Sequence, residues 1–296
     1  MKQVETGRGI ALSVGASALF ALLPAYTRLL APLGGLDIFA WRIIWTVPGA
    51  LALVAVRGRL PELAGLIAGA ARTPRTAVAL VAAAALLGVQ LWLFMWAPLH
   101  GRVLEVSLGY FLLPLSMVLV GRFIYRERLA PLQWLAVACA ALGVAHELWA
   151  THAFSWPTLL IALGYPIYFM IRRTVVGDSL TTFATEMTLL LPAAMLIIAT
   201  SPGAQAAFDR PVLWAAWLPG LGALSTIALA CYLKSSRLLP MALFGILGYV
   251  EPVLLVVLSV TLLGEKLSAQ QYATYVPIWM AVAITGVHSA LLLRAR

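Results

Sequence analysis

The sequence predicts an all-α integral membrane protein with ten transmembrane helices, arranged as two inverted five-helix repeats around a central cavity. Three observations lead to this prediction. Of the 296 residues, 62% are hydrophobic and only 10% are charged, whereas a soluble domain is about 25% charged. The apolar residues form long unbroken runs, and the two halves of the chain share motifs in the same order.

Ten apolar runs are long enough to cross a bilayer as helices, which takes roughly 17 to 25 residues each. They cover residues 9–27, 36–56, 76–98, 103–120, 129–147, 154–171, 180–200, 211–233, 240–262 and 270–292. None of them alternates between apolar and polar residues with period two, as membrane β-strands do. The first run lacks a small-x-small cleavage site, so we expect a retained helix and not a signal peptide.

Positive charge is distributed unevenly between the two sides of the membrane. The net charge is +9, and fifteen of the 20 Lys and Arg residues fall on one side if both termini are cytoplasmic. This asymmetry is the positive-inside pattern that sets orientation. We therefore expect a multi-pass membrane protein with both termini cytoplasmic. Its basic residues should contact anionic lipids of the bilayer and not a nucleic acid.

Motifs typical of enzymes and metal sites are missing. The chain has no GxxxxGK[ST] phosphate loop, no HExxH and no GxSxG, the patterns that would indicate nucleotide hydrolysis, a zinc protease or a hydrolase. Cys139 and Cys231 both lie inside predicted helices, which favours apolar packing over a disulfide or metal ligation. We expect no enzymatic activity, no cofactor and no metal.

An internal repeat divides the chain into residues 9–147 and 154–292. LGYFLLP at 108–114 corresponds to LGYVEP at 247–252, and LDIFAWRIIWTVP at 36–48 to LTTFATEMTLLLP at 180–192. The aligned pairs include Pro114/Pro252 and Glu127/Glu265 at a separation of 138, and Pro48/Pro192, Arg42/Glu186 and Arg28/Arg172 at 144. Because each unit has five spans, the second must cross the membrane in the opposite sense. Inverted repeats of this kind are typical of secondary transporters, with a substrate site near the midplane.

The repeated phrase places a proline and a glycine at equivalent positions. Pro114 has no N–H for the carbonyl of Tyr110, and Pro252 has none for that of Gly248. A freed carbonyl is tolerated against another helix or a wet cavity but is costly against lipid. We therefore predict kinked, inward-facing helices at both positions, with Gly109 and Gly248 allowing close packing. A packing kink without substrate contact is the alternative.

Charged residues inside predicted spans are candidates for binding. Arg42, Glu186 and Glu251 lie at depths where a charge costs about 2.5 to 3.5 kcal/mol on insertion scales, so each should face inward or be paired. Arg42 and Glu186 are expected at different depths, roughly 15 Å apart, so a direct pair between them is not expected. A role in packing through hydrogen bonds is the alternative to binding a charged group of the substrate or a proton.

Further candidates are polar and aromatic residues within spans. Tyr and Trp could hold a small amphipathic solute by stacking while they donate hydrogen bonds, although such residues also serve as core or interface anchors. The remaining candidate substrate or cavity residues are Gln90, Trp92, Trp96, Glu105, Ser107, Tyr110, Tyr165, Tyr168 and Tyr249. His146 and Glu147 give another span a polar end, for which an interface position is expected.

These motifs resemble a known family. The run 92–144, with its core Glu-x-x-Leu-Gly-Tyr-Phe-x-x-Pro from Glu105 to Pro114, resembles the RarD-type branch of EamA-domain proteins in the drug/metabolite transporter superfamily. So do RGIALSVGASALFALLPAYTRLL at 8–30 and GEKLSAQQ at 264–271. The resemblance implies an inner-membrane carrier of two EamA repeats, similar in function to aromatic amino-acid exporters of the YddG type. Trp41 departs from the family pattern, which usually has histidine there.

Three functions follow as hypotheses. The first is a secondary exporter of amino acids, including aromatic or apolar ones, and the second is an exporter of drugs or other small metabolites. The third is a membrane sensor or scaffold that binds a metabolite without moving it. The sequence leaves the exact substrate, proton coupling and oligomeric state open.

Overall fold

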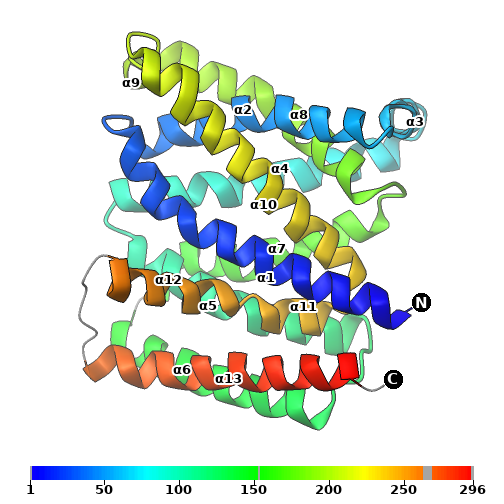
Figure 1. Ribbon diagram of the computed structural model, residues 1–296, viewed down its shortest axis with the longest axis vertical. Coiled ribbons are helices and arrows are strands. Elements are labelled where there is room, and N and C mark those ends of the chain that lie inside the picture. Colours follow the sequence, from blue (N-terminus) through cyan, green and yellow to red (C-terminus); the bar gives the residue numbers. More distant parts are fainter. Residues whose placement is uncertain (1, 153, 263–268, 295–296) are drawn as a thin grey trace. The chain divides into compact units, whose positions relative to one another are not determined.

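The computed structural model describes residues 2–152, 154–262 and 269–294, and every regular element among them is helical (Figure 1). The α-helices are α1 (Lys2–Thr27), α2 (Gly35–Val56), α3 (Leu60–Arg72), α4 (Pro74–Leu99), α5 (Val103–Leu119), α6 (Pro131–Thr151), α7 (Trp156–Thr174), α8 (Ser179–Thr200), α9 (Pro202–Gln205), α10 (Leu218–Leu238), α11 (Met241–Leu247), α12 (Val250–Leu262) and α13 (Ala269–Arg294). Three short elements join them: the 3-10 turn η1 (Arg28–Leu30) and the π-helical turns η2 (Val120–Ile124) and η3 (Leu213–Trp217).

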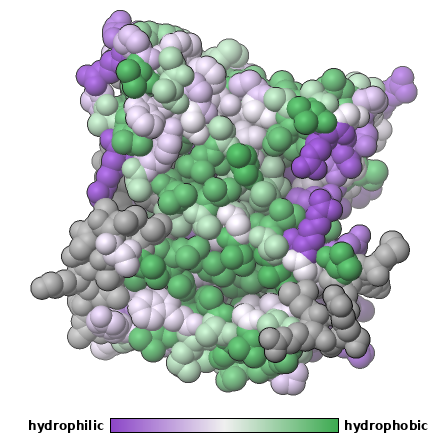
Figure 2. All heavy atoms as spheres, in the orientation of Figure 1, coloured by the Kyte–Doolittle hydropathy of each residue, from purple (hydrophilic) through white to green (hydrophobic). Residues whose placement is uncertain are grey.

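Eight helical segments of the described chain are long and apolar enough to cross a membrane. They are Val4–Leu30, Gly35–Val56, Pro74–Leu93, Glu105–Ile124, Pro131–Thr151, Ser179–Thr200, Leu213–Leu238 and Gln270–Leu291. The prediction of an all-α, multi-pass membrane protein is therefore confirmed. Figure 2 shows apolar side chains along the middle of the visible helices and hydrophilic ones toward helix ends.

The other two predicted spans have a different character. The segment 154–171 forms α7, which is less apolar because it carries Arg172 and Arg173 as well as prolines and tyrosines. The segment 240–262 is divided into α11 and α12, and only the shorter stretch Met241–Leu254 counts as an apolar helix.

Helix boundaries recur at the offsets of the sequence repeat. The two ends of α2 and the two ends of α8 are 144 residues apart. The starts of α5 and α11, and those of α6 and α13, are 138 residues apart. Of the aligned motif residues, Glu265 and most of 264–271 lie outside the described residues.

The chain forms two compact units, each made of segments from both halves of the sequence. Unit 1 comprises residues up to 21, 103–166 and those from 234 onward, and unit 2 comprises 22–102 and 167–233. The most extensive helix contacts of unit 1 are between α6 and α13 and between α5 and α11, and those of unit 2 are between α2 and α8. These are the helices that the repeat alignment makes equivalent.

Each of these helix pairs is antiparallel. In unit 1, His146 near the end of α6 contacts Thr274 near the start of α13, with Nδ1 to Oγ1 at 2.9 Å. In unit 2, Ser201, which ends α8, donates its hydroxyl to Asp37 in the first turn of α2 at 2.6 Å.

Close approach of α5 and α11 in unit 1 depends on glycine. A Cβ added to Gly245 would lie 2.9 Å from the carbonyl oxygen of Pro114, and one added to Gly121 would lie 2.7 Å from the backbone nitrogen of Ala242. Small residues let membrane helices approach to backbone distance. Glu127, in the segment after η2, then fixes the start of α11, since its two carboxylate oxygens accept the N–H groups of Met241 at 2.7 Å and Ala242 at 2.8 Å.

Candidate functional site

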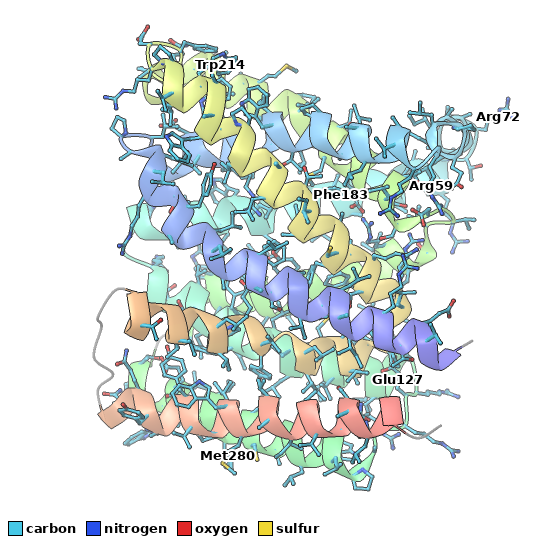
Figure 3. The ribbon with its side chains drawn as sticks, viewed as in Figure 1. Arg59, Arg72, Glu127, Phe183, Trp214 and Met280 are labelled. Atoms are coloured by element: carbon cyan, nitrogen blue, oxygen red, sulfur yellow. The ribbon has the colours of Figure 1, made fainter. Side chains whose placement is uncertain are left out.

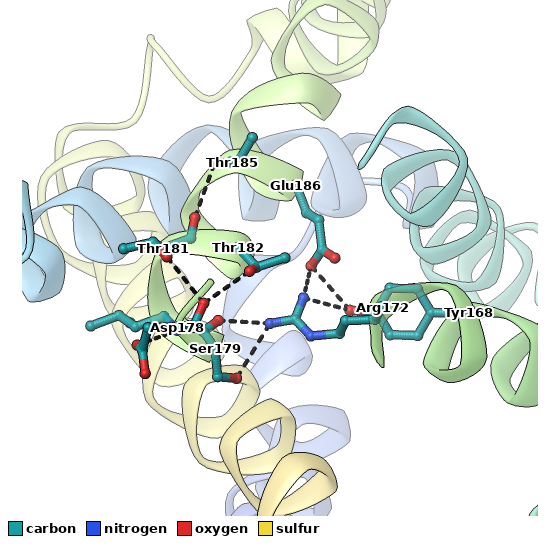
Figure 4. Close-up of polar contacts among 9 residues, drawn as sticks. Tyr168, Arg172, Asp178, Ser179, Thr181, Thr182, Thr185 and Glu186 are labelled. Atoms are coloured by element: carbon teal, nitrogen blue, oxygen red, sulfur yellow. Dashed lines mark hydrogen bonds and ion pairs between the residues drawn. The ribbon is translucent and has the colours of Figure 1, made fainter. Parts of the chain in front are cut away.

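Unit 2 contains a buried ion pair between the end of α7 and the first half of α8. The side chains of Arg172 and Glu186 are 1% and 0% exposed, and Nη1 of Arg172 contacts Oε2 of Glu186 (Figure 4). Tyr168 donates its hydroxyl to the same Glu186 oxygen at 3.1 Å and accepts from Arg172 at 3.2 Å. Because an isolated charge is costly inside a bilayer, the pairing makes both charges tolerable at this depth.

Arg172 also holds the beginning of α8. Its Nη2 donates to the carbonyl oxygen of Ser179 at 2.6 Å and contacts the Ser179 hydroxyl at 3.4 Å. Asp178 caps the helix by accepting the N–H of Leu180 at 2.8 Å, and the hydroxyls of two threonines in the first turn donate to its carbonyl. The guanidinium therefore joins α7, the start of α8 and the Glu186 carboxylate in one network (Figure 4).

Arg42 lies on α2 in the same unit and has a different partner. Its side chain is 7% exposed, and Nε donates to the hydroxyl of Ser225 on α10 at 2.8 Å. Gly222, one turn before Ser225, lets α10 approach α2, since a Cβ there would lie 2.5 Å from the carbonyl carbon of Trp45.

The remaining candidates of unit 2 lie on α4. Gln90 is fully buried. The rings of Trp92 and Trp96 are 5.7 Å apart, and the Trp96 ring stacks on His100 at 4.1 Å. This side-by-side arrangement follows from the i, i+4 spacing.

In unit 1, the beginning of α5 packs on the beginning of α7 around Glu105. The hydroxyl of Ser155 donates to the Glu105 carboxylate, and that of Thr158 donates to the Glu105 carbonyl at 2.7 Å. Gly109 lies in this contact, since a Cβ there would come within 3.0 Å of the Thr158 carbonyl oxygen. A carboxylate near a helix N-terminus is stabilised by the helix dipole, so Glu105 supports the start of α7 as well as being a candidate for binding.

Two predicted tyrosines meet one turn further along α5. The rings of Tyr110 and Tyr165 are 6.2 Å apart. Ser107 is half-buried on α5, as is Tyr110, whereas Tyr165 is 9% exposed. Glu105 and the Tyr110–Tyr165 pair thus lie along the same contact between α5 and α7.

The break between α11 and α12 lies at the repeated glycine–tyrosine phrase. The N–H groups of Gly248 and Tyr249 bond to carbonyls three residues earlier, at 2.8 and 3.2 Å, and Pro252 cannot donate to the carbonyl of Gly248. Glu251 and Pro252 follow in the first turn of α12, both half-buried. The hydroxyl of Tyr249 donates to the carbonyl of Phe111 on α5 at 2.8 Å.

The equivalent proline in α5 has another effect. Pro114 lies inside α5, which continues as one helix from Val103 to Leu119. Its ring contacts the break in the other helix, because a Cβ on Gly248 would lie 3.5 Å from Pro114 Cγ. The helix is interrupted only at the second copy of the phrase among the described residues.

Trp41 belongs to the core of unit 2. It is 2% exposed, and its Nε1 donates to the carbonyl of Ala204 at 3.0 Å. Its ring makes edge contacts with Phe208 and Trp214 at 5.3 and 5.2 Å. Trp41 therefore packs α2 against α9 and the residues that follow it.

Arg172 is a buried charged residue that sequence reasoning missed. The predicted span 154–171 ends just before Arg172. The sequence therefore places Arg172 among the cytoplasmic basic residues. The repeat offset of 144 that pairs it with Arg28 is the one sequence feature that singles it out.

Thr274 was also missed. It donates to Glu147 at 2.7 Å and contacts His146, so the polar end predicted for this span is tied to α13.

The candidate sites present charged and aromatic groups. Among the described residues, no group of three or more His, Cys, Asp or Glu side chains could hold a metal ion. The charged and aromatic groups can bind ammonium, carboxylate or aromatic moieties, or hold helices together.

Sequence comparison identifies relatives over nearly the whole length of the chain. The chain is 49% identical over 290 residues to a Pseudomonas aeruginosa protein named chloramphenicol-sensitive protein RarD, covering 98% of this chain and 97% of that protein. The chain belongs to the RarD family. Another RarD, from Escherichia coli, is 30% identical over 96% of this chain and 95% of its own length. A protein of Haemophilus influenzae, 35% identical over 96% of this chain and 95% of its own length, is named an uncharacterized transporter.

The fold of this RarD family member is shared with a solved structure. A crystal structure aligns with a TM-score of 0.72 and 19% identity, covering 95% of this chain and 98% of the other. No model of a known protein family matches the chain. RarD membership and the apolar helices together make the chain a multi-pass membrane transporter.

Proposed function

We propose that this RarD family member exports amino acids, including aromatic and apolar ones, from the cytoplasm across the inner membrane. The observation that carries the proposal is the set of charged and aromatic residues inside apolar helices of a transporter-family chain. An amino acid presents an ammonium, a carboxylate and a side chain, for which carboxylates, arginines and aromatic rings are complementary partners.

The proposed architecture is ten membrane crossings in two inverted repeats with both termini cytoplasmic, working by alternating access. Two observations support it. Helix ends recur at offsets of 138 and 144 residues, and the helices made equivalent by those offsets pack antiparallel.

The buried carboxylates divide into two groups in this proposal. Glu186 is held by Arg172 and Tyr168, so we assign it to stabilising α7 against α8. Glu251 lies half-buried beside a helix break, where backbone and side chain can both bind a ligand. We assign Glu251, with Glu105, Tyr110 and Tyr165, to the substrate pathway.

Substitution of Glu251 tests this assignment. Glu251→Gln is nearly isosteric, and we expect it to lower amino-acid export by at least about tenfold, the effect of losing roughly 1.4 kcal/mol of binding. Surface expression should stay unchanged. Efflux of labelled phenylalanine from cells gives the rate, with Glu5→Gln on an exposed part of α1 as control. Wild-type efflux in Glu251→Gln would remove Glu251 from the pathway.

A drug exporter is the second candidate, favoured by the name of the Pseudomonas relative. A competition assay distinguishes the amino-acid exporter from the drug exporter. Chloramphenicol or an unlabelled amino acid should slow the efflux of a labelled compound only if it binds at the same site as that compound. Inhibition by chloramphenicol without inhibition by any amino acid would establish the second candidate in place of the first.

A further inference from the structure

Helix α3 differs from every membrane-crossing helix of unit 2 in direction. It connects the end of α2 to the start of α4. In Figure 1 it is seen nearly end-on, whereas α2 and α8 run across the view. If α2 and α8 cross the membrane, α3 lies along the membrane surface.

The sequence of α3 gives it two apolar faces that differ in exposure. Leu66 faces the protein and packs with Leu80 and Val175. A second edge, Leu60, Ala64, Ile67 and Ala71, is exposed along its whole length. The spacing i, i+4, i+7, i+11 puts these four on one line, and two of them are large, with Leu60 52% and Ile67 54% exposed.

The ends of α3 carry positive charge, and Glu62 in its first turn is the one acidic residue of the helix. Arg57 precedes α3, Arg72 ends it and Arg75 follows in the first turn of α4, and all three are exposed. Arg59 bonds to Glu62 at 2.9 Å and approaches Asp178 at 3.3 Å, so it joins α3 to the turn before α8 (Figure 3). Arginines therefore flank an exposed apolar edge at both ends of the helix.

We propose that α3 is an in-plane helix that binds anionic phospholipid, with its Leu60–Ala64–Ile67–Ala71 edge among the acyl chains and Arg57, Arg72 and Arg75 on headgroup phosphates. Charge complementarity selects the ligand, because guanidinium groups bind phosphate oxygens in bidentate geometry and basic residues next to an apolar face are attracted to anionic leaflets. None of these residues belongs to the proposed substrate pathway.

Nitroxide scanning tests the orientation of α3. In a background with Cys139→Ala and Cys231→Ala, single labels are attached at Leu60→Cys and Ile67→Cys, and at Gly65→Cys and Gly69→Cys as controls. Both glycines have open space for a Cβ. In vesicles containing phosphatidylglycerol, the first two labels should be relaxed mainly by oxygen and the control labels mainly by a water-soluble nickel chelate. Equal nickel accessibility at Ile67 and Gly65 would overturn the proposal.

Native mass spectrometry tests the headgroup preference. The full chain, purified from mixed lipid, should retain phosphatidylglycerol over phosphatidylcholine, and each of Arg72→Gln and Arg75→Gln should lower that preference by about fivefold at low salt. Arg210→Gln, an exposed arginine elsewhere in unit 2, serves as the matched control. An unchanged preference in both variants, or an equal loss in the control, would contradict the assignment.

Discussion

Burial decides what Arg172 and Glu186 contribute to this protein. Each has an opposite charge as direct partner and both are almost completely buried. Removal of one member of such a pair leaves an uncompensated charge, whereas replacement of both by apolar residues of similar volume is often neutral. A structural pair and a residue that binds substrate therefore respond differently to paired substitutions.

We predict that Glu186→Leu lowers the free energy of unfolding by about 3–5 kcal/mol, because it strands the Arg172 guanidinium. The double variant Arg172→Met, Glu186→Leu should recover most of this loss. Thermal unfolding in detergent measures both, with Glu5→Gln at an exposed position of α1 as control. Additive losses in the double variant would show that the two residues do not act as a pair.

The buried positions of Arg42 and Glu186 could be predicted from the sequence, but their partners could not. The cost of charge in a bilayer requires any such residue to be compensated, and both lie in long apolar runs. The partner of Glu186 is Arg172. Their contact depends on where α7 ends and on the path that residues 175–178 take from α7 to α8. Ser225, the partner of Arg42, is 183 residues away in sequence.

At the scale of secondary structure, one carboxylate caps the start of α11. The N–H groups at a helix start have no partner within the helix, and Glu127 satisfies two of them with one side chain. Gly121 is required beside it, because a Cβ there would lie 2.7 Å from Glu127 Oε2.

Glu127→Ala should lower the free energy of unfolding by about 1–2 kcal/mol, as for the loss of other N-terminal caps. Glu127→Gln keeps one acceptor oxygen and should lose less. The melting temperature of the detergent-purified protein reports both changes. A melting temperature equal to that of Glu5→Ala, an exposed control on α1, would refute the capping role.

Glycine contacts between helices lead to a matched pair of substitutions. A Cβ on Gly143 of α6 would lie 2.6 Å from the Thr274 carbonyl oxygen of α13, whereas one on Gly286 of α13 would meet nothing within 4 Å. Gly143→Ala should therefore destabilise by about 1–3 kcal/mol through overpacking. Gly286→Ala should be neutral or stabilising by up to about 1 kcal/mol. Equal unfolding temperatures for the two variants would contradict this packing.

Helices were more predictable than their interruptions. Apolar runs and the repeat anticipate α2, α6 and α8 closely, because hydrophobic length alone defines a span. Helix α3 lies in a segment rich in alanine, glycine and arginine that gives no span signal. The helix is broken between α11 and α12, whereas α5 continues through its proline. This difference depends on how each proline packs, and the two similar sequence motifs do not predict it.

At the scale of the whole chain, membership of the RarD family and the eight apolar helices found in its described parts establish a multi-pass transporter. The repeated helix ends and the antiparallel packing of equivalent helices support the inverted-repeat proposal, which would give ten crossings. The substrate is decided by a few side chains, so relatives that share the fold need not share it.

Counterflow in proteoliposomes tests the amino-acid carrier most directly. Vesicles with correctly folded protein are loaded with one unlabelled amino acid at a time, and the uptake of labelled phenylalanine or threonine is followed against empty vesicles. The proposal predicts tracer accumulation that depends on several internal amino acids, aromatic and apolar ones included. No accumulation above empty vesicles, from protein that still binds the tracer, would contradict it.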